Sequence, residues 1–579
     1  MELGEKLIDV GGQMYEDISQ HSGDGGLYAE LLQNRAFQLV EPGTEDSLLA
    51  WDTIGSANIS VVADDVPVSS ALPNSMELVV LNDAFGAVGF ANEGYWGIKV
   101  DEAATYNVSF YYRFPEASDF GGDVKIGLQS SSGDLLASTT VEISGAQTEW
   151  AQITTELTPS ASASDVNNLF TVTLDGAAAA GLTIHFAMFS LFPPTFKERA
   201  NGMRIDIAQA LVDMGPAFFR LPGGNNLVSF CLTGLGLYEY LLWCEDGGME
   251  PIMGVFAGYA LQQETVAEDD LEPYIQEAID QIHFAVSDAD TSDAAALRAS
   301  LGHPEPFAIR YIEIGNEDWI SDVASETRQR LLITPDETVF IATSDVSGPV
   351  LDPIPTSYDV HDYQDPAWFQ EQVFYYDDFE RNGTTYFEGE YSCKYDRAGE
   401  SWLYPSVLSA VAEAAFMTGL ERNSDIVFAA AYAPVLNHVN ATDWTPNLIA
   451  FDAGNVYLST SYYVQQLFAF NSGDEYLPST LPTFNGTLFW SVARNDSAVI
   501  IKVANMDAED ANMTFELPFN GVAESGTVTY ITGNEADMNT PENPDLITPQ
   551  TTTVQSSSSF GYTALGMSFA VLVVGIDSQ

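Results

Sequence analysis

The sequence predicts an α/β protein built on a TIM-type (β/α)8 barrel, with one β-sandwich inserted in the barrel and a second at the C-terminus. Three observations support this. Strand-like apolar runs alternate with helical runs over residues 193–474 and, together with a first strand near the start, number eight. Residues 51–192 show short alternating runs broken by Gly, Ser, Asp and Asn, without helical periodicity. The same texture returns after residue 474.

We therefore divide the chain into four segments. Residues 1–50 form the first β/α unit, 51–192 the inserted sandwich, 193–474 the rest of the barrel and 475–579 the C-terminal sandwich. In the first unit we expect a strand over residues 7–15 and a helix over 29–37. The other expected barrel strands cover residues 217–221, 251–256, 308–314, 339–344, 358–363, 385–390 and 426–432. The clearest helical runs cover residues 201–213, 237–245, 271–286, 407–418 and 462–470.

Composition narrows the classes of function. The 19 Lys and Arg residues against 83 Asp and Glu leave a formal net charge of −64. Such a field repels phosphate backbones and anionic membranes, which argues against nucleic-acid or membrane partners and favours a neutral substrate. The apolar run at residues 564–576 is too short to span a bilayer. The three cysteines form neither a disulfide framework nor a metal-ligand spacing.

Seven Asn-x-Ser/Thr triplets and the acidic composition predict a secreted, N-glycosylated protein. The first six residues contain no apolar signal core, which leaves open either an intracellular chain or an incomplete start. We expect an extracellular location. The acceptor residues are Asn58, Asn107, Asn382, Asn440, Asn485, Asn495 and Asn512.

Two strand-like runs end in glutamates. Residues 307–314 lead into Gly315-Asn316-Glu317, and an aromatic run from residue 385 leads into Gly389-Glu390. In such barrels the residues at the C-terminal tips of strands carry the chemistry. Two carboxylates on facing strands are what glycoside cleavage needs, because one protonates the leaving oxygen and the other attacks the anomeric carbon. Either glutamate alone could instead be bound to neighbouring backbone at a strand end.

The motifs resemble those of glycoside hydrolase family 51, the α-L-arabinofuranosidases, in the fungal form with an inserted carbohydrate-binding-like sandwich. The similarity follows the chain in order over nearly its whole length. It is carried by Arg220-Leu221-Pro222-Gly223-Gly224-Asn225, Trp243-Cys244-Glu245-Asp246, Gly302-His303-Pro304-Glu305-Pro306-Phe307 and Gly389-Glu390-Tyr391, together with residues 15–18, 22–30, 33–37, 313–319, 419–425 and 461–466.

The resemblance implies that Glu317 is the catalytic acid/base and Glu390 the nucleophile. An acid needs a raised pKa, and we expect the neighbouring Glu390 carboxylate to supply part of that rise. Glu388 lies two residues earlier on the same side and is expected behind the site at most. Glu413 and Glu421, on or after a helix, are expected to be solvated or to cap it.

Six further residues are assigned to the arabinofuranose pocket by the same resemblance: Glu16, Arg220, Asn225, Asn316, His361 and Tyr363. Asn316 would bind the 2-hydroxyl of the sugar, Arg220 and Asn225 would orient nucleophile and sugar, and Glu16 would bind furanose hydroxyls. Three alternatives stay open. Glu16 could be a surface charge, His361 a core histidine, and Arg220 the partner of a structural carboxylate.

The resemblance thus implies a retaining, exo-acting α-L-arabinofuranosidase acting on arabinose-containing plant cell-wall polysaccharides or oligosaccharides, with no metal or organic cofactor. Exposed aromatics of the insert, with Trp51 and Trp96 as candidates, could hold polymer, or the insert could be purely structural. Two alternatives remain. The segment after Asn225 is shorter than in the family, through deletion or an incomplete gene sequence, so the chain could be an impaired carbohydrate-binding homologue. It could also be another retaining barrel glycosidase, such as a xylosidase or endoglucanase.

Overall fold

A closed barrel of eight parallel strands forms the centre of the computed structural model, which describes residues 12–17, 22–224, 227, 234–260, 264–318, 338–343 and 354–577. In order around the barrel the strands are β1 (Gly12–Met14), β12 (Phe218–Leu221), β13 (Glu250–Val255), β16 (Tyr311–Ile314), β17 (Val339–Ala342), β18 (Ser357–Gln364), β19 (Thr385–Cys393) and β20 (Val427–Tyr432). β1 pairs with both β12 and β20, which closes the barrel. The predicted fold class is confirmed.

Apolar side chains fill the lower interior of this barrel, toward the N-terminal ends of the strands. Polar groups occupy the upper layer, toward the C-terminal ends. Met14, Phe218, Ile252, Ile341 and Phe387, from five different strands, form one buried cluster. Because side chains alternate along a strand, the residue two positions after Phe218 projects into the same interior, one layer higher. The barrel interior is therefore a packed core below and a polar site above.

Helices cover the outside of the barrel. They are α1 (Ile205–Asp213), α2 (Leu237–Gly247), α3 (Glu272–Val286), α4 (Asp293–Ser300), α6 (Pro366–Glu371), α7 (Val407–Arg422) and α8 (Thr460–Phe470). Among the described helices, none is both long and apolar enough to cross a bilayer. Sequence periodicity did not reveal α4 or α6, which are short. N-cap side chains begin both: Ser292 accepts from Ala295 N, and Asp365 accepts from Ala367 N and Trp368 N.

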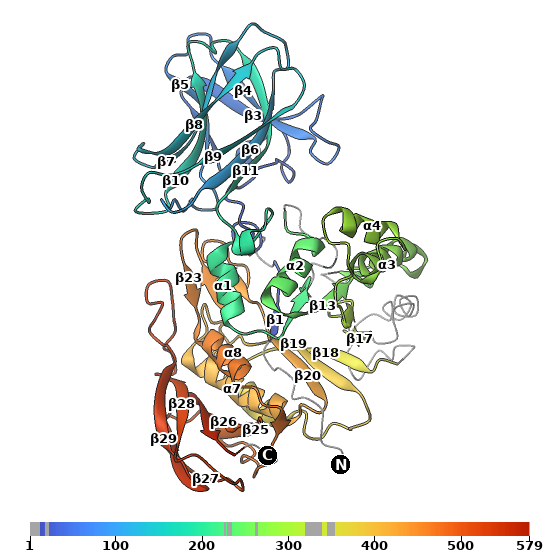
Figure 1. The fold of residues 1–579 in the computed structure, drawn as a ribbon, viewed down its shortest axis with the longest axis vertical. Coiled ribbons are helices and arrows are strands. Elements are labelled where there is room, and N and C mark those ends of the chain that lie inside the picture. The colour runs from blue at the N-terminus through green and yellow to red at the C-terminus, as the bar shows by residue number, and fades with distance from the viewer. Residues whose placement is uncertain are drawn as a thin grey trace.

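The insert is a sandwich of two five-stranded sheets, seen at the top of Figure 1. One sheet has the order β2-β5-β10-β7-β8 and the other β3-β4-β11-β6-β9. The strands are β2 (Trp51–Ile54), β3 (Ala57–Ala63), β4 (Asn74–Val80), β5 (Ala87–Asn92), β6 (Tyr106–Arg113), β7 (Gly121–Ser130), β8 (Leu135–Ser144), β9 (Ala151–Leu157), β10 (Asn168–Asp175) and β11 (Thr183–Phe192). Trp51 is 4% exposed and packs on Phe90 and Phe189 in the core. The prediction that Trp51 contacts polymer is therefore wrong.

The C-terminal region forms a six-stranded sheet, β24-β25-β26-β31-β28-β29, and a two-stranded sheet, β27-β30, beside α7 and α8 (Figure 1). Its strands are β24 (Glu475–Tyr476), β25 (Leu488–Arg494), β26 (Ala498–Asn505), β27 (Ala511–Glu516), β28 (Ser525–Thr532), β29 (Gln550–Gln555), β30 (Ser559–Ala564) and β31 (Ser568–Gly575). Two small sheets lie in loops: β14 (Tyr259–Ala260) with β15 (Glu264–Thr265), and β21 (Leu436–His438), β22 (Ile449–Phe451) and β23 (Val456–Leu458). The division of the chain at residues 50/51, 192/193 and 474/475 stays a prediction.

Helix α7 is buried along nearly its whole length, because it lies between barrel strand β19 and the C-terminal sheet. Glu413 and Glu421 are therefore neither solvated nor capping, contrary to prediction. Glu413 accepts hydrogen bonds from Cys393 N at 2.9 Å and Ser461 Oγ at 2.6 Å. Glu421 pairs with Lys502 and Ser491 of the C-terminal sheet. Each buried carboxylate thus has polar partners from a neighbouring element.

The helix predicted for residues 29–37 is absent, and the segment consists of turns that join the barrel to the insert. Asn34 and Phe37 have φ of 52° and 55°, which interrupts a helix. The Glu30 carboxylate accepts from Leu32 N at 3.1 Å and from Leu191 N at 2.8 Å, so it ties this segment to the end of β11. Within the predicted first strand, residues 12–14 are strand and residues 7–11 lie outside the described residues.

Candidate active site

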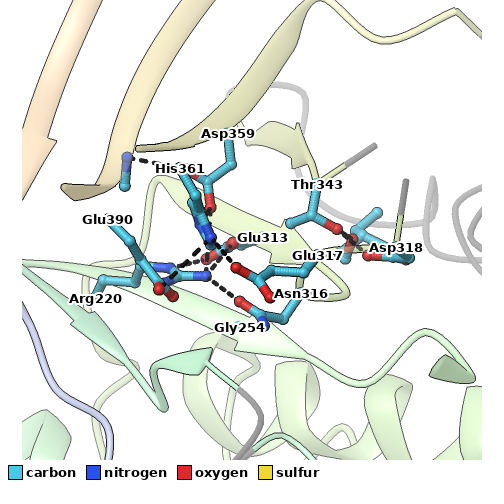
Figure 2. Close-up of polar contacts among 12 residues, drawn as sticks. Arg220, Gly254, Glu313, Asn316, Glu317, Asp318, Thr343, Asp359, His361 and Glu390 are labelled. Atoms are coloured by element: carbon cyan, nitrogen blue, oxygen red, sulfur yellow. Dashed lines mark hydrogen bonds and ion pairs between the residues drawn. The ribbon is translucent and has the colours of Figure 1, made fainter. Parts of the chain in front are cut away.

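Glu317 and Glu390 meet above the polar layer of the barrel (Figure 2). Glu317 follows the end of β16 and Glu390 lies within β19, which continues three residues beyond the end we predicted. One carboxylate oxygen of each lies within 4.8 Å of the other. The Glu317 side chain is 31% exposed and that of Glu390 4%. One carboxylate therefore faces the opening and the other lies deep.

Two donors orient the Glu390 carboxylate. Arg220 Nη1 donates to Oε1 at 2.6 Å, and Tyr363 Oη donates to Oε2 at 2.6 Å. The Tyr363 ring is itself held edge-on against Trp444, with 5.1 Å between ring centroids. Both oxygens of Glu390 are engaged, so this side chain has a single orientation.

His361 connects the two carboxylates. Its Nδ1 lies 2.9 Å from Glu317 Oε1 and 3.6 Å from Glu390 Oε2, and its Nε2 lies 2.7 Å from Asp359 Oδ2. Burial works to lower the pKa of His361, but the Asp359 and Glu390 carboxylates and its hydrogen bonds raise it well above the ordinary value. The imidazolium form is therefore favoured, with both nitrogens donating.

The predicted rise in the pKa of Glu317 is not found. Burial works in that direction, but the hydrogen bond and charge of His361, with the charge of Arg220, lower the pKa of Glu317 below its ordinary value. The backbone of Glu317 has φ of 53°, a left-handed conformation that glutamate rarely adopts. The acid/base candidate is thus strained and bonded to a cation.

Two further buried carboxylates, Glu313 and Asp359, lie next to Arg220 and His361. They were not singled out from the sequence. Glu313 accepts from Arg220 Nε at 2.5 Å and from Nη2 at 2.6 Å, while Asp359 Oδ2 lies 3.3 Å from the same Nη2. The negative charge of Asp359 also acts on Glu313. Burial raises the pKa of Glu313 to about 8 against the pull of Arg220. Arg220 therefore has both a structural carboxylate and the nucleophile candidate as partners.

Gly389 is explained by this polar layer. A Cβ added to it would lie 2.0 Å from Asp359 Oδ1, and its N–H donates to that oxygen at 3.0 Å. Period-two spacing could have indicated Asp359, which lies two residues before His361 on β18. The glycine before Glu390 thus permits a close contact between neighbouring strands.

The other predicted pocket residues divide into described and undescribed positions. Asn316 accepts from Arg220 Nη2 at 2.8 Å, and no described residue accepts from its buried Nδ2. Glu16 lies beyond the end of β1, and a Cβ on Gly224 would lie 2.1 Å from its carboxylate. Its charge acts on Tyr363, which places it at the same end of the barrel. Asn225 and the shortened segment after it, like most of the stretch after Glu317, lie outside the described residues.

The Glu388 side chain projects from the other face of β19, away from this site. It is fully buried and accepts from Tyr376 Oη at 2.7 Å. Glu317, His361 and Glu390 are also the described cluster whose ligand-type atoms are close enough to surround an ion. Because the Nδ1 of His361 points its proton at Glu317, we assign no metal to these residues.

Comparisons with known proteins identify the family. One family model, described as the α-L-arabinofuranosidase 1 domain, matches residues 229–381, and a second, the α-L-arabinofuranosidase C-terminal domain, matches residues 389–568. α-L-Arabinofuranosidase A of Aspergillus kawachii is 35% identical over 97% of this chain and 93% of its own length. The Aspergillus niger protein of the same name is 34% identical over the same shares. The chain belongs to the family 51 α-L-arabinofuranosidases.

Solved structures agree with this family 51 assignment. The arabinose-bound crystal structure of the α-L-arabinofuranosidase MgGH51 is 50% identical and superposes with a TM-score of 0.96, covering 100% of this chain and 99% of that chain. The Thermotoga maritima α-L-arabinofuranosidase, at 17% identity and a TM-score of 0.54 over 65% of this chain and 90% of that chain, shows a shared fold. The family predicted from the motifs is confirmed, and this arabinofuranosidase homologue is a glycoside hydrolase.

Proposed function

We propose that the protein is a retaining, exo-acting α-L-arabinofuranosidase that removes terminal non-reducing α-L-arabinofuranosyl residues from arabinoxylan- or arabinan-type polysaccharides. The separation of the two carboxylates carries this proposal. Retaining glycosidases hold their carboxyl groups about 5–5.5 Å apart, and inverting ones about 6.5–9.5 Å. Oxygens of Glu317 and Glu390 that approach within 4.8 Å leave too little room for a water between sugar and base.

Glu390 is the nucleophile in this proposal. Its carboxylate, held by Arg220 and Tyr363, attacks the anomeric carbon and forms a covalent glycosyl-enzyme while the bond to the leaving oxygen breaks. Glu317, the more exposed of the two, passes to that oxygen the proton that it shares with His361 Nδ1. In the second half Glu317 takes a proton from water, the water oxygen bonds to the anomeric carbon, and Glu390 is released.

Asn316 and Glu16 would bind the sugar. The buried Nδ2 of Asn316 has no acceptor among the described residues, and a hydroxyl at the 2-position of the bound sugar would supply one. The Glu16 carboxylate, near Tyr363, would accept from a furanose hydroxyl. Asn225 stays a candidate for the same pocket. These contacts suit one terminal arabinofuranose, as its relative MgGH51 is described as binding arabinose.

An extracellular, glycosylated location would suit such polymeric substrates. Six of the seven acceptor asparagines are exposed and Asn495 is half-buried, so all are accessible in part. The strongly negative net charge would keep the protein apart from anionic surfaces without opposing neutral polysaccharides.

Stereochemistry tests the proposal directly. Incubation with 4-nitrophenyl α-L-arabinofuranoside in methanol-containing buffer should yield methyl α-L-arabinofuranoside, detected by proton NMR, because two inversions restore the configuration. Glu390→Ala should lose turnover and, with azide, form the β-azide. Glu317→Ala with azide should form the α-azide.

Other outcomes separate the alternatives. A folded wild-type protein that binds arabinose by calorimetry without turnover would identify an impaired carbohydrate-binding homologue. Hydrolysis of xylosides or glucans in preference to the arabinofuranoside would identify another barrel glycosidase. A β-configured methanolysis product would exclude a retaining mechanism.

A further inference from the structure

Asp359 is a buried carboxylate that neither step of the proposed double displacement uses. It is 4% exposed, and all its contacts lead to groups of the site. Oδ1 accepts from Gly389 N at 3.0 Å, and Oδ2 lies 2.7 Å from His361 Nε2 and 3.3 Å from Arg220 Nη2. Asp359 thus lies between the acid/base side and the nucleophile side (Figure 2).

We propose that Asp359 is a positioning residue for the catalytic acid/base: it holds His361 so that a protonated Nδ1 faces Glu317. This inference rests on the proposed function, in which Glu317 transfers the proton. Asp359 itself touches neither substrate nor reacting atoms.

The argument begins with the two nitrogens of His361. A carboxylate only accepts hydrogen bonds, so Nε2, 2.7 Å from Asp359 Oδ2, must carry a proton. The proton that the ring gains or loses is then the one on Nδ1, 2.9 Å from Glu317 Oε1. Asp359 therefore determines which tautomer remains when His361 is neutral, and this tautomer offers Nδ1 as an acceptor for a protonated Glu317.

The proton between His361 and Glu317 depends on every charge around the ring. Glu317 approaches from the loop after β16, Glu390 from β19 at 3.6 Å, and Asp359 from β18, the strand of His361 itself. The positive charge of Arg220, from β12, opposes these three carboxylates. Among the charges that raise the pKa of His361, Asp359 contributes most. Removing that negative charge should release the shared proton at lower pH.

Asp359, rather than Glu313, carries the negative charge of these two carboxyl groups. Burial and the charge of Asp359 raise the pKa of Glu313 against the pull of Arg220, whereas His361 and Arg220 lower the pKa of Asp359 against burial. The proton therefore lies on Glu313, and the pair carries one negative charge. That charge faces His361.

A purely structural role for Asp359 makes a different prediction. Through Gly389 N it also supports the strand that carries Glu390. If this contact were its function, removal would slow nucleophilic attack equally for every leaving group. If Asp359 acts through His361 on Glu317, removal should harm poor leaving groups selectively, because activated ones need no proton.

The kinetic test compares the wild type with Asp359→Asn on an activated aryl arabinofuranoside and on an alkyl arabinofuranoside. We expect kcat/KM on the alkyl substrate to fall at least about tenfold more than on the aryl substrate, and its basic limb to move to lower pH. Equal losses on both substrates with an unmoved pH profile would overturn the proposal.

Asp362→Asn is the matched control. Asp362 is a partly buried carboxylate of the same strand that faces the other side, where its charge acts on Glu388. Asp362→Asn should leave the ratio of kcat/KM on the alkyl substrate to kcat/KM on the aryl substrate unchanged. In the double variant Asp359→Asn/His361→Gln, that ratio should match His361→Gln alone. An additive loss would show that Asp359 acts by another route.

Nitrogen-15 NMR of the six histidines tests the inference without turnover. The His361 signals, assigned by their absence in His361→Gln, should titrate at lower pH in Asp359→Asn than in the wild type, whereas Asp362→Asn should show a smaller change. An unchanged His361 titration would overturn the inference even in an active enzyme. A wild type that hydrolyses no arabinofuranoside would refute the proposed function, while the NMR comparison would still decide the role of Asp359.

Discussion

Several residues of this site have backbone conformations or buried charges that cost folding free energy. Glu317 has φ of 53°. Glu313 and Asp359 are two buried carboxyl groups that both contact Arg220. A non-glycine residue in the left-handed region costs on the order of 1 kcal/mol, which the surrounding contacts must offset. Such strain is typical of residues held for chemistry rather than for packing.

Tyr363→Phe tests the orientation of the nucleophile at this scale. It removes the hydroxyl that donates to Glu390 Oε2 at 2.6 Å and leaves the ring against Trp444. We expect kcat on aryl arabinofuranosides to fall roughly tenfold, the loss of one hydrogen bond of about 1.4 kcal/mol, without a change in fold by circular dichroism.

Tyr376→Phe is the corresponding control. Its hydroxyl donates at 2.7 Å to Glu388, a buried carboxylate behind the same strand but outside the site. This variant should lower the unfolding temperature and leave kcat within twofold of the wild type. Equal effects of both variants on kcat would argue against a specific role for Tyr363.

At the scale of elements, polar contacts join the barrel to the inserted sandwich and to the C-terminal sheets. Lys502 of β26 forms a buried ion pair with Glu421 of α7, and Lys99 of the insert donates to Gly454 O at 2.8 Å. The Trp96 ring packs on His438 of β21, at 4.6 Å between centroids. These contacts hold both sandwiches against the loops and helices of the barrel.

Breaking the buried pair should destabilise the protein without affecting catalysis. Lys502→Met leaves the Glu421 carboxylate buried with Ser491 as a donor, so we expect a loss of about 3–5 kcal/mol in the free energy of unfolding. Urea unfolding measures this. Adding Glu421→Leu should recover part of the loss. A double variant less stable than Lys502→Met would contradict this explanation, because it would show that the unpaired Glu421 carboxylate is not the cause of the loss.

Trp96→Ala tests the insert loop as a polymer contact. Trp96, a residue of the insert, is 39% exposed and has φ of 55°. Its ring packs against His438, in the region of the chain that follows barrel strand β20, and sugar rings could stack on its exposed part. KM for arabinoxylan should rise several-fold while kinetics on an aryl arabinofuranoside stay unchanged. Phe85→Ala, at a 77% exposed position of the insert, is the control. Unchanged polymer kinetics would leave Trp96 a structural contact.

At the scale of the whole molecule, buried acids that keep their protons dominate the pH dependence of stability. Burial raises the pKa of Asp24 and Glu413 to about 7, of Glu313 to about 8, and of Asp318 and Asp362 to about 6. Each group binds more protons folded than unfolded between its ordinary and its raised pKa. Stability therefore falls as pH rises through that window.

We expect the unfolding temperature to be several degrees lower at pH 8 than at pH 5, at constant ionic strength, by calorimetry. Repulsion within a chain of net charge −64 acts in the same direction. Glu413→Gln should flatten the slope between pH 5 and 7, because it replaces a group that is neutral when folded. An unfolding temperature that rises with pH would contradict this assignment of protons. Below pH 4, loss of the ionised Asp64, whose pKa its hydrogen-bond donors lower to about 2 against burial, should reverse the trend.

Local sequence patterns predicted those parts of the fold that depend on neighbours along the chain. The strand ending before Glu317, the helix around residues 407–418 and the change from helical to alternating texture at the insert are all periodic signals. They failed for residues 29–37, where an apolar, helix-like composition is overridden by contacts of Glu30 with the insert. They also failed for Trp51, because exposure depends on what packs against a side chain.

The sequence by itself determined the barrel, its two added sandwiches, the family and the candidate catalytic pair, because strand periodicity and motif order are local properties of the chain. Only the tertiary structure decided the charge of the site. The pKa values of Glu317 and Glu313 depend on Arg220 from β12 and on His361 and Asp359 from β18, two strands far apart in the sequence. Proton positions are set by burial and by charges a few ångströms away in space, and distances in space between strands cannot be read from distances along the chain.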